Sequence, residues 1–330
     1  MVIKRLCLDS WENRILCLPQ RGIGDLIFFL PLLHSLHSSF PASEIFIPST
    51  SQGTPYFQLI NLIGFLSKTP KFLPNVSQDE FELHRQIAFR ECKGKLKREY
   101  EHKIYEKYLQ GEQYDLLINS RSNRVESVLC ASQVTRKDVE ESYPFHRKHM
   151  VDRFLFYADY LGIPRVVSFK LDLTRQDLTD ESIRGEYVIF NLGGSVKEKK
   201  WSTTGYSNVS QWCAKKGLSV ILIGGEEDRD QASQIQGSNV INRVGCHNGY
   251  AIRDIVPLVR GSRVCLSGDT GILHLADALG AKVLGLYGPT SPERYGPYNQ
   301  REYVISRNRI DQKLENICSC EVIGFLEQIV

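Results

Sequence analysis

The feature that most constrains the fold of this chain is a repeated order of apolar strand, glycine-containing turn and helix. Near the start, the apolar segment 14–18 precedes a turn with two glycines, and a helical pattern follows as far as residue 37. After residue 186 the same order returns, with strands predicted at 187–191, 219–223, 240–243, 263–266 and 282–287. Strands that alternate with helices in this way build parallel sheets. We therefore predict an α/β protein with two doubly wound, Rossmann-like domains.

The length of the chain and one polar segment predict where these domains divide. A hydrophobic core rarely grows beyond about 250–300 residues, and this chain has 330. The stretch 166–186 is polar and weakly periodic, as a linker would be. We predict domains at 1–170 and 171–310 and a C-terminal helix in 311–330, where apolar residues recur at helical spacing. Within the first domain we also predict strands at 44–47 and 114–119, with a helix over 85–110 between them.

The composition is that of a soluble globular protein, with 42% hydrophobic and 24% charged residues. The apolar run 26–33 is too short to span a membrane and lacks the basic leader of a signal peptide. Nine cysteines, scattered through a chain of this size, favour reduced thiols in a cytosolic setting. Cys318 and Cys320, with Cys246 and His247 elsewhere, lack the paired spacing of a zinc site, so no metal is predicted.

The charge is unevenly distributed, because the whole excess of three positive charges lies in residues 1–165. Basic residues are densest over 85–107. Others follow at Arg121, Arg124, Arg136, Lys137, Arg147, Lys148 and Arg153. This half of the chain either contacts an acidic or phosphorylated partner or presents a solvated helix face.

Ligands of parallel sheets bind beyond the carboxyl ends of the strands, so each turn between a strand and a helix is a candidate site. The first such turn contains Arg21, Gly24 and Asp25. Asp25 either caps the following helix or faces the ligand, and at a helix N-terminus its pKa is expected to be depressed. A dinucleotide fingerprint would need another glycine near position 27, where this chain has Ile27.

The next two turns carry the ingredients of a nucleotide site. Gly194, Ser195 and Lys199 follow a predicted strand, and such a set can cradle a diphosphate with backbone donors and a mobile positive charge. The alternative is that the lysines of this turn are simply solvated. In the turn after strand 219–223, Glu226 and Asp228 either cap the next helix or accept hydrogen bonds from ribose hydroxyls.

The fourth turn, 268–271, opens a helix that carries Leu273, Leu275 and Leu279 at helical spacing. The first N–H groups of a helix lack intrahelical partners, and the helix dipole favours an anion there. A phosphate is one candidate for that position. The alternative is that Asp269 or Thr270 caps the helix.

Taken together, these turns resemble glycosyltransferase family 9, the heptosyltransferases. The resemblance extends from residue 14 to 297. It is carried by Gly24-Asp25 before an apolar helix with Pro31, by Gly194-Ser195 and Lys199-Lys200-Trp201, by the turn 224–228, by Asp269-Thr270-Gly271 with His274 and Leu279-Gly280, and by Tyr287-Gly288-Pro289-Thr290 with Gly296-Pro297. It implies a GT-B fold, in which two Rossmann-like domains face a central cleft.

The resemblance also implies roles for individual residues. Asp25 would be the general base that takes the proton of the acceptor hydroxyl. The donor nucleotide sugar would be bound by Gly194, Ser195, Lys199, Glu226 or Asp228, Asp269, Thr270 and Gly271, with His274 packed beneath the loop. The acceptor would be bound by Arg21, Gly24, Arg121, Arg124, Arg147 and Lys148.

The implied reaction is an inverting transfer of heptose from ADP-heptose to an acceptor hydroxyl, with no cofactor and no metal, because Lys199 and a helix dipole can stabilise the leaving diphosphate. The expected acceptor is the acidic inner core of lipopolysaccharide, and no nucleic acid partner is expected. The enzyme would be cytoplasmic, in peripheral contact with the inner membrane. Three alternatives stay open: a protein or natural-product acceptor, a nucleotide-sugar epimerase of the same fold, and a non-catalytic nucleotide-binding protein.

Overall fold

The computed structural model describes residues 14–19, 22–47, 59–60, 63, 113–121, 129–143, 148–171, 185–194, 196–245 and 252–330. The packing of the chain divides it into two compact units. The first comprises Met1–Arg21, Pro31–His146 and Asp152–Ser168, and the second comprises Gly22–Leu30, Arg147–Val151 and Phe169–Val330. The domain boundaries predicted from the sequence stay a prediction. The predicted helix over 85–110 lies outside the described residues.

The first unit contains a parallel sheet with the strand order β2-β1-β3-β4. Its strands are β1 (Arg14–Leu18), β2 (Glu44–Phe46), β3 (Gln113–Asn119) and β4 (Leu129–Thr135), and its helices include α5 (Arg136–Ser142) and α6 (Met150–Leu161). Thr135 and Asp138 form a capping box at the start of α5. Neither β4 nor the helices α5 and α6 were among the elements predicted from the sequence.

Helix α1 (Ile23–Ser39) connects β1 to β2. It continues through Pro31, whose carbonyl oxygen accepts a hydrogen bond of 2.8 Å from the hydroxyl of Ser35. Its apolar residues from Leu26 to Leu33 are almost fully buried. The apolar run that could be mistaken for a membrane or leader segment is therefore the buried part of an ordinary helix. None of the described helices is both long and apolar enough to cross a bilayer.

The second unit contains a six-stranded parallel sheet with the order β10-β9-β8-β5-β6-β7. Its strands are β5 (Tyr187–Asn191), β6 (Ser219–Ile223), β7 (Val240–Asn242), β8 (Cys265–Gly268), β9 (Val283–Tyr287) and β10 (Val304–Ser306). Five of them lie where the sequence predicted strands, within two residues. The three-residue β10 was not predicted.

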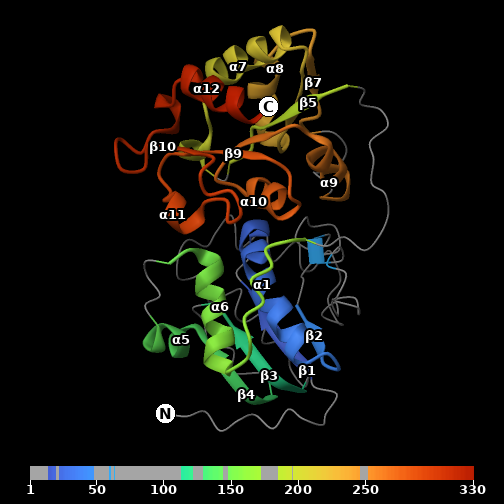
Figure 1. The fold of residues 1–330 in the computed structure, drawn as a ribbon, viewed down its shortest axis with the longest axis vertical. Helices are drawn as coiled ribbons and strands as arrows, with labels where there is room; N and C mark the ends of the chain where they lie inside the picture. Colours follow the sequence, from blue (N-terminus) through green and yellow to red (C-terminus); the bar gives the residue numbers. More distant parts are fainter. Residues whose placement is uncertain are drawn as a thin grey trace, which may run out of the picture. The chain divides into compact units, whose positions relative to one another are not determined.

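Helices cover both faces of this sheet, with α7, α8 and α12 on one face and α9 and α10 on the other (Figure 1). Their bounds are α7 (Thr203–Lys215), α8 (Arg229–Gln234), α9 (Ile252–Gly261), α10 (Gly271–Ala278), α11 (Pro292–Tyr295) and α12 (Ser319–Ile329), with short 3-10 turns at Lys197–Lys199, Glu226–Asp228 and Leu314–Asn316. Strands β5, β8 and β9 are buried along their whole length. This double covering is what a near-continuous run of apolar residues in a parallel strand requires.

The strand order has one reversal that matters for function. The chain proceeds from β5 to β6 and β7 on one side, then returns to place β8 on the other side of β5. Helices connected to the two sides diverge at such a point, which leaves a crevice beyond the carboxyl ends of the central strands. Here those ends are Asn191 of β5 and Gly268 of β8.

The cysteines differ in part from the expectation of reduced thiols. Cys17, Cys130, Cys213 and Cys265 are free, whereas Cys318 and Cys320 form a disulfide. Their Cα atoms lie 5.2 Å apart at the start of α12, within the range that a disulfide can bridge. Among the described residues, no group of three or more His, Cys, Asp and Glu could hold a metal ion.

Candidate functional site

A pocket of about 610 Å³ opens at the reversal point of the second unit, and every residue that lines it belongs to that unit. Its lining comes from the start of α1 and from the turns after β5, β6, β8 and β9. The lining residues are Gly22, Ile23, Gly24, Asp25, Phe28, Asn191, Gly193, Gly194, Lys199, Gly224, Gly225, Glu227, Asp269, Thr270, Gly271, Ile272, His274, Thr290 and Tyr295. The structure thus brings eight of the predicted site residues together: Gly24, Asp25, Gly194, Lys199, Asp269, Thr270, Gly271 and His274.

Asn191 fixes the centre of the pocket, where the ends of β5 and β8 meet. It is 2% exposed and pairs in register with Ser267. Its amide nitrogen donates to the hydroxyl oxygens of Ser267 and Thr270, at 2.9 Å each. The sequence shows Asn191 only as the last residue of a strand. Its role in holding the turn after β8 follows from the strand order, which the sequence does not reveal.

Helix α10 begins at this turn and presents an uncapped N-terminus to the pocket. Thr270 occupies the N-cap position but makes no capping hydrogen bond, because its hydroxyl is engaged with Asn191 and Ser267. The Asp269 side chain is directed to other partners. The capping alternative for these two residues is therefore wrong. The first backbone N–H groups of α10 thus receive no capping side chain, and such an N-terminus is able to bind an anion.

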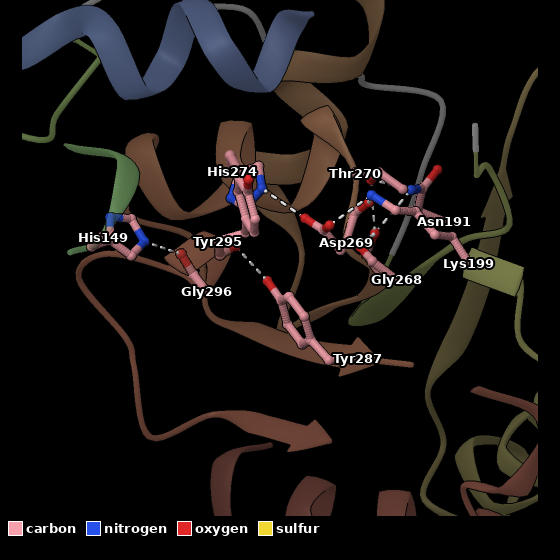
Figure 2. A network of polar contacts seen from close by, with 11 residues as sticks. His149, Asn191, Lys199, Gly268, Asp269, Thr270, His274, Tyr287, Tyr295 and Gly296 are labelled. Atoms are coloured by element: carbon pink, nitrogen blue, oxygen red, sulfur yellow. Dashed lines mark hydrogen bonds and ion pairs between the residues drawn. The ribbon is translucent and has the colours of Figure 1, made fainter. Parts of the chain in front are cut away.

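Asp269 is the hub of the polar network at this end of the pocket (Figure 2). One carboxylate oxygen accepts from Lys199 Nζ at 2.7 Å, and the other lies 3.3 Å from His274 Nε2. Burial alone would raise the pKa of Asp269, but the hydrogen bonds and charges of His274 and Lys199 outweigh it and lower this pKa to about 2. The carboxylate consequently stays ionised and holds both partners in place at neutral pH.

His274 is 2% exposed, and its ring lies 4.3 Å from that of Phe28, centroid to centroid. It therefore packs against Phe28 of α1, and it also lines the pocket. The close approach leaves little room for a side chain at Gly24, where an added Cβ would lie 3.0 Å from His274 Cδ2. A glycine at this position lets the start of α1 pack directly on α10.

Asp25 lies in the first turn of α1 and lines the pocket. Its Oδ2 accepts a hydrogen bond of 3.0 Å from the Gly22 N–H, so the carboxylate caps the helix with one oxygen. Within the described residues, the other oxygen takes no hydrogen bond. Capping and a role in the pocket were posed as alternatives, and the geometry is compatible with both.

The expected depressed pKa of Asp25 is wrong. Burial raises the pKa of this carboxyl, and the charge of Asp269 adds to that effect; the Gly22 N–H, His274 and Lys199 oppose it without reversing it. The helix N-terminus is the only influence visible in the sequence, whereas burial depends on the folded chain, in which Gly271 and His274 of α10 pack against the start of α1. A raised pKa makes the carboxylate a stronger base.

Four glycines line the pocket beside the turns after β5 and β6: Gly193, Gly194, Gly224 and Gly225. Beneath them Lys200 forms an ion pair with Asp228, which also accepts from the Gly225 N–H at 2.8 Å. A Cβ added to Gly224 would lie 2.8 Å from Asp228 Oδ2, and one added to Gly194 would lie 3.1 Å from Lys200 Cγ. This surface of the pocket is therefore built from backbone.

The two acidic residues predicted to hold a ribose do not line the pocket. Asp228 is fully buried by the pair with Lys200, and Glu226 is exposed and pairs with Arg229 at 2.7 Å. Glu227, which lies between them in the sequence, lines the pocket instead. The 3-10 turn over Glu226–Asp228 points its three consecutive carboxylates in different directions. No periodic pattern in the sequence reveals which of the three lines the pocket.

Segment 288–296 follows β9 and contributes Thr290 and Tyr295 to the lining of the pocket. We call this segment the pinned wall, because hydrogen bonds hold two of its carbonyl oxygens in place. The buried Tyr287 hydroxyl donates to the Tyr295 carbonyl oxygen at 2.8 Å, and His149 Nε2 lies 2.9 Å from the Gly296 carbonyl oxygen (Figure 2). Val151 donates its backbone N–H to His149 Nδ1, so the ring carries its proton on Nε2 and donates to Gly296. This segment contains the motif Tyr287-Gly288-Pro289-Thr290 with Gly296-Pro297, for which the family resemblance implies no individual role.

The remaining predicted site residues are not in the pocket or are not described. Arg121 lies in the first unit, where its Nε donates to the Pro19 carbonyl oxygen at 2.8 Å. Lys148 is exposed. Arg21, Arg124, Arg147 and Ser195 lie outside the described residues, as do Cys246 and His247.

Comparison with known proteins identifies the family. Residues 129–322 match the model of glycosyltransferase family 9 (heptosyltransferase), which is more than half of the chain. The chain belongs to glycosyltransferase family 9. The resemblance seen in the sequence motifs is thereby confirmed.

Curated members of family 9 match this chain over part of its length. The lipopolysaccharide core heptosyltransferase OpsX of Haemophilus influenzae is 26% identical over 168 residues, which is 48% of each chain. Lipopolysaccharide heptosyltransferase 1 of Pseudomonas aeruginosa is 27% identical over 47% of this chain and 44% of its own. The chain thus spans about half the length of these family 9 relatives.

Solved structures match over nearly the whole length and establish the fold. The E. coli heptosyltransferase WaaC with ADP has a TM-score of 0.71 and 18% identity, covering 96% of this chain and all of that one. The E. coli ADP-heptose heptosyltransferase II has a TM-score of 0.60 and 16% identity, covering 96% and 98%. The family 9 chain described here therefore has the GT-B fold that its motifs implied.

Proposed function

We propose that this family 9 protein is an inverting, metal-independent glycosyltransferase that moves a heptose from ADP-heptose to an acceptor hydroxyl. The observation that carries the proposal is that one pocket holds a desolvated carboxylate, a lysine and an uncapped helix N-terminus. Base and phosphate-binding groups are the two requirements of such a transfer. The curated relatives are named as lipopolysaccharide heptosyltransferases, and one solved relative was determined with ADP.

In the proposed mechanism, Asp25 takes the proton of the acceptor hydroxyl as its oxygen attacks the anomeric carbon. The bond from that carbon to the diphosphate oxygen breaks on the opposite face, so the configuration inverts and ADP leaves. Lys199 and the first N–H groups of α10 stabilise the negative charge that develops on the diphosphate. Asp269 takes no part in bond making and positions Lys199 through their hydrogen bond.

For the acceptor we propose the inner core of lipopolysaccharide, presented at the cytoplasmic face of the inner membrane. The names of the curated relatives support this choice. An acidic glycolipid also suits the excess of positive charge in residues 1–165. The same acceptor makes a cytoplasmic enzyme in peripheral contact with the membrane the expected localisation.

Calorimetric titration with ADP and with UDP tests the donor assignment. We expect wild-type protein to bind ADP in preference to UDP, and Lys199→Ala to weaken ADP binding by about 10- to 100-fold, the loss of a hydrogen bond to a charged group. Lys197→Ala is the matched control, because Lys197 is exposed and does not line the pocket. A preference for UDP, or the absence of binding by either nucleotide, would show that the proposal is wrong.

A further inference from the structure

The pinned wall contains a tyrosine whose side chain has no established task. Tyr295 ends α11 and lines the pocket. Its ring is partly exposed, and within the described residues its hydroxyl makes no hydrogen bond. Its own carbonyl oxygen is held by Tyr287, and the next carbonyl along the chain is held by His149. An aromatic side chain on fixed backbone, whose hydroxyl has no protein partner within the described residues, is a preformed surface for a ligand.

The strand order locates this surface relative to the other parts of the pocket. From β9 to β6 the sheet runs β9-β8-β5-β6, and each strand delivers one part of the lining beyond its carboxyl end. The Tyr295 carbonyl is bonded to the last residue of β9, whereas Gly224, Gly225 and Glu227 follow β6. Three strand spacings of about 4.8 Å separate these ends by roughly 14 Å.

The phosphate-binding groups lie between those two ends. Lys199 and Gly194 follow β5, and Asp269 with the N-terminus of α10 follows β8. If the diphosphate of a nucleotide sugar occupies this middle position, its nucleoside and its sugar must extend to opposite sides. The side after β6 offers a backbone surface and one carboxylate, which suit a nucleoside. The side after β9 offers an aromatic ring and a free hydroxyl.

We propose that Tyr295 is a specificity-determining residue that binds the sugar of the donor. Its ring packs on the C–H face of the sugar, and its hydroxyl forms a hydrogen bond with a sugar hydroxyl. A tyrosine combines the apolar and polar surfaces that a polyhydroxylated ring presents. This inference rests on the proposed function, because it takes the middle of the pocket as the diphosphate site.

The test compares a ligand that has the sugar with one that lacks it. ADP-heptose and ADP are titrated by calorimetry into wild-type protein, Tyr295→Phe and Tyr295→Ala. We expect ADP affinity to change by less than about twofold in both variants. We expect ADP-heptose affinity to fall a few-fold in Tyr295→Phe, which loses one hydrogen bond, and by more than about tenfold in Tyr295→Ala, which also loses the ring.

Controls separate a role in binding from a role in the fold. Both variants keep the backbone carbonyl that Tyr287 holds, so the melting temperature should fall no more than in Tyr160→Ala, a partly exposed tyrosine of α6 outside the pocket. If Tyr295→Ala weakens ADP and ADP-heptose equally, or weakens neither, the inference is wrong. If wild-type protein binds neither ligand, the proposed function is wrong, and this inference, which rests on it, is wrong as well.

Discussion

The chemistry of the pocket rests on two aspartates that the fold treats in opposite ways. Asp269 accepts a hydrogen bond from Lys199 and contacts His274, and these partners lower its pKa to about 2. Asp25 receives one backbone N–H, and burial raises its pKa. In the proposed mechanism these two carboxylates have different roles: Asp269 stays charged and positions Lys199, whereas Asp25 accepts the proton of the acceptor hydroxyl. Such separation of pKa values is a mark of acid–base sites.

Asp25→Asn should slow transfer strongly while leaving ADP binding intact. The amide keeps the size of the side chain and can still accept from Gly22, but it cannot take the acceptor proton, so we expect the transfer rate to fall by about 10²–10⁴-fold. Steady-state assays with ADP-heptose and calorimetry with ADP separate the two effects. A variant that retains more than a tenth of the wild-type rate would exclude Asp25 as the base.

The pH dependence follows from the direction of the same shift. The base must be ionised, so the wild-type rate should fall as the pH drops through the raised pKa of Asp25, and the residual rate of Asp25→Asn should lack this acid limb. Because the folded-state pKa is raised above the unfolded one, ionisation of Asp25 costs stability as the pH rises through it. The melting temperature of Asp25→Asn at pH 7 should therefore equal or exceed that of the wild type.

At the scale of elements, glycines determine how closely the segments that line the pocket approach one another. Gly268 ends β8, and a Cβ added there would lie 2.7 Å from the carbonyl oxygen of Lys199. Gly271 begins α10, and its added Cβ would lie 2.8 Å from Ile23 Cβ. The strand end and the helix start can hold Lys199 and α1 at the pocket only because both positions lack a side chain.

Gly268→Ala should displace the segment that carries Lys199. The obstructing atom is backbone, which cannot swing away, so we expect lower stability and an ADP affinity reduced by tenfold or more. Gly324→Ala in α12 is the matched change, because an added Cβ meets nothing within 4 Å there and alanine favours a helix by about 0.5–1 kcal/mol. Denaturant unfolding and ADP calorimetry should separate the two variants; similar behaviour would refute the steric argument.

Elements with strong local patterns were predictable, and elements defined by their neighbours were not. Strand β5 consists of four apolar residues and Asn191, two glycines follow after Leu192, and its bounds were predicted correctly. Strand β10 has only three residues and exists through pairing with β9, where Val304 faces Gly285. Helix α6 has buried Met150, Val151, Phe154, Leu155 and Ala158 at helical spacing, a signal that was present in the sequence and overlooked.

At the scale of the whole molecule, the strand order determines which turns lie next to one another and so form one pocket. Alternation of strands and helices predicts parallel sheets, but the sequence contains no local signal for the return of the chain from β7 to β8. That return places the Thr270 turn beside Asn191 and creates the pocket. The site could be predicted as a set of turns through family motifs, whereas the contribution of Asn191 and Glu227 depends on side-chain direction that only the folded chain defines.

Transfer by this protein should not require a divalent cation. Lys199 and the N-terminus of α10 already supply positive charge where the diphosphate would lie. We expect the rate with ADP-heptose to be unchanged after treatment with excess EDTA, and addition of Mg²⁺ or Mn²⁺ to alter it by less than about twofold. Loss of activity that a cation restores would show that the metal-independent mechanism is wrong.

The hydrogen bond from the Tyr287 hydroxyl to the Tyr295 carbonyl oxygen does not contribute to the pH dependence of this pocket. Tyr287 is completely buried, and burial with the charges of Asp269 and Asp277 raises its pKa well above 10. Its hydroxyl therefore remains a donor at the pH values at which the protein is assayed, and its hydrogen bond to the Tyr295 carbonyl oxygen is kept. A change of ligand affinity with pH therefore has its origin in groups other than the Tyr287 hydroxyl, with Asp25 the first candidate because its pKa is raised.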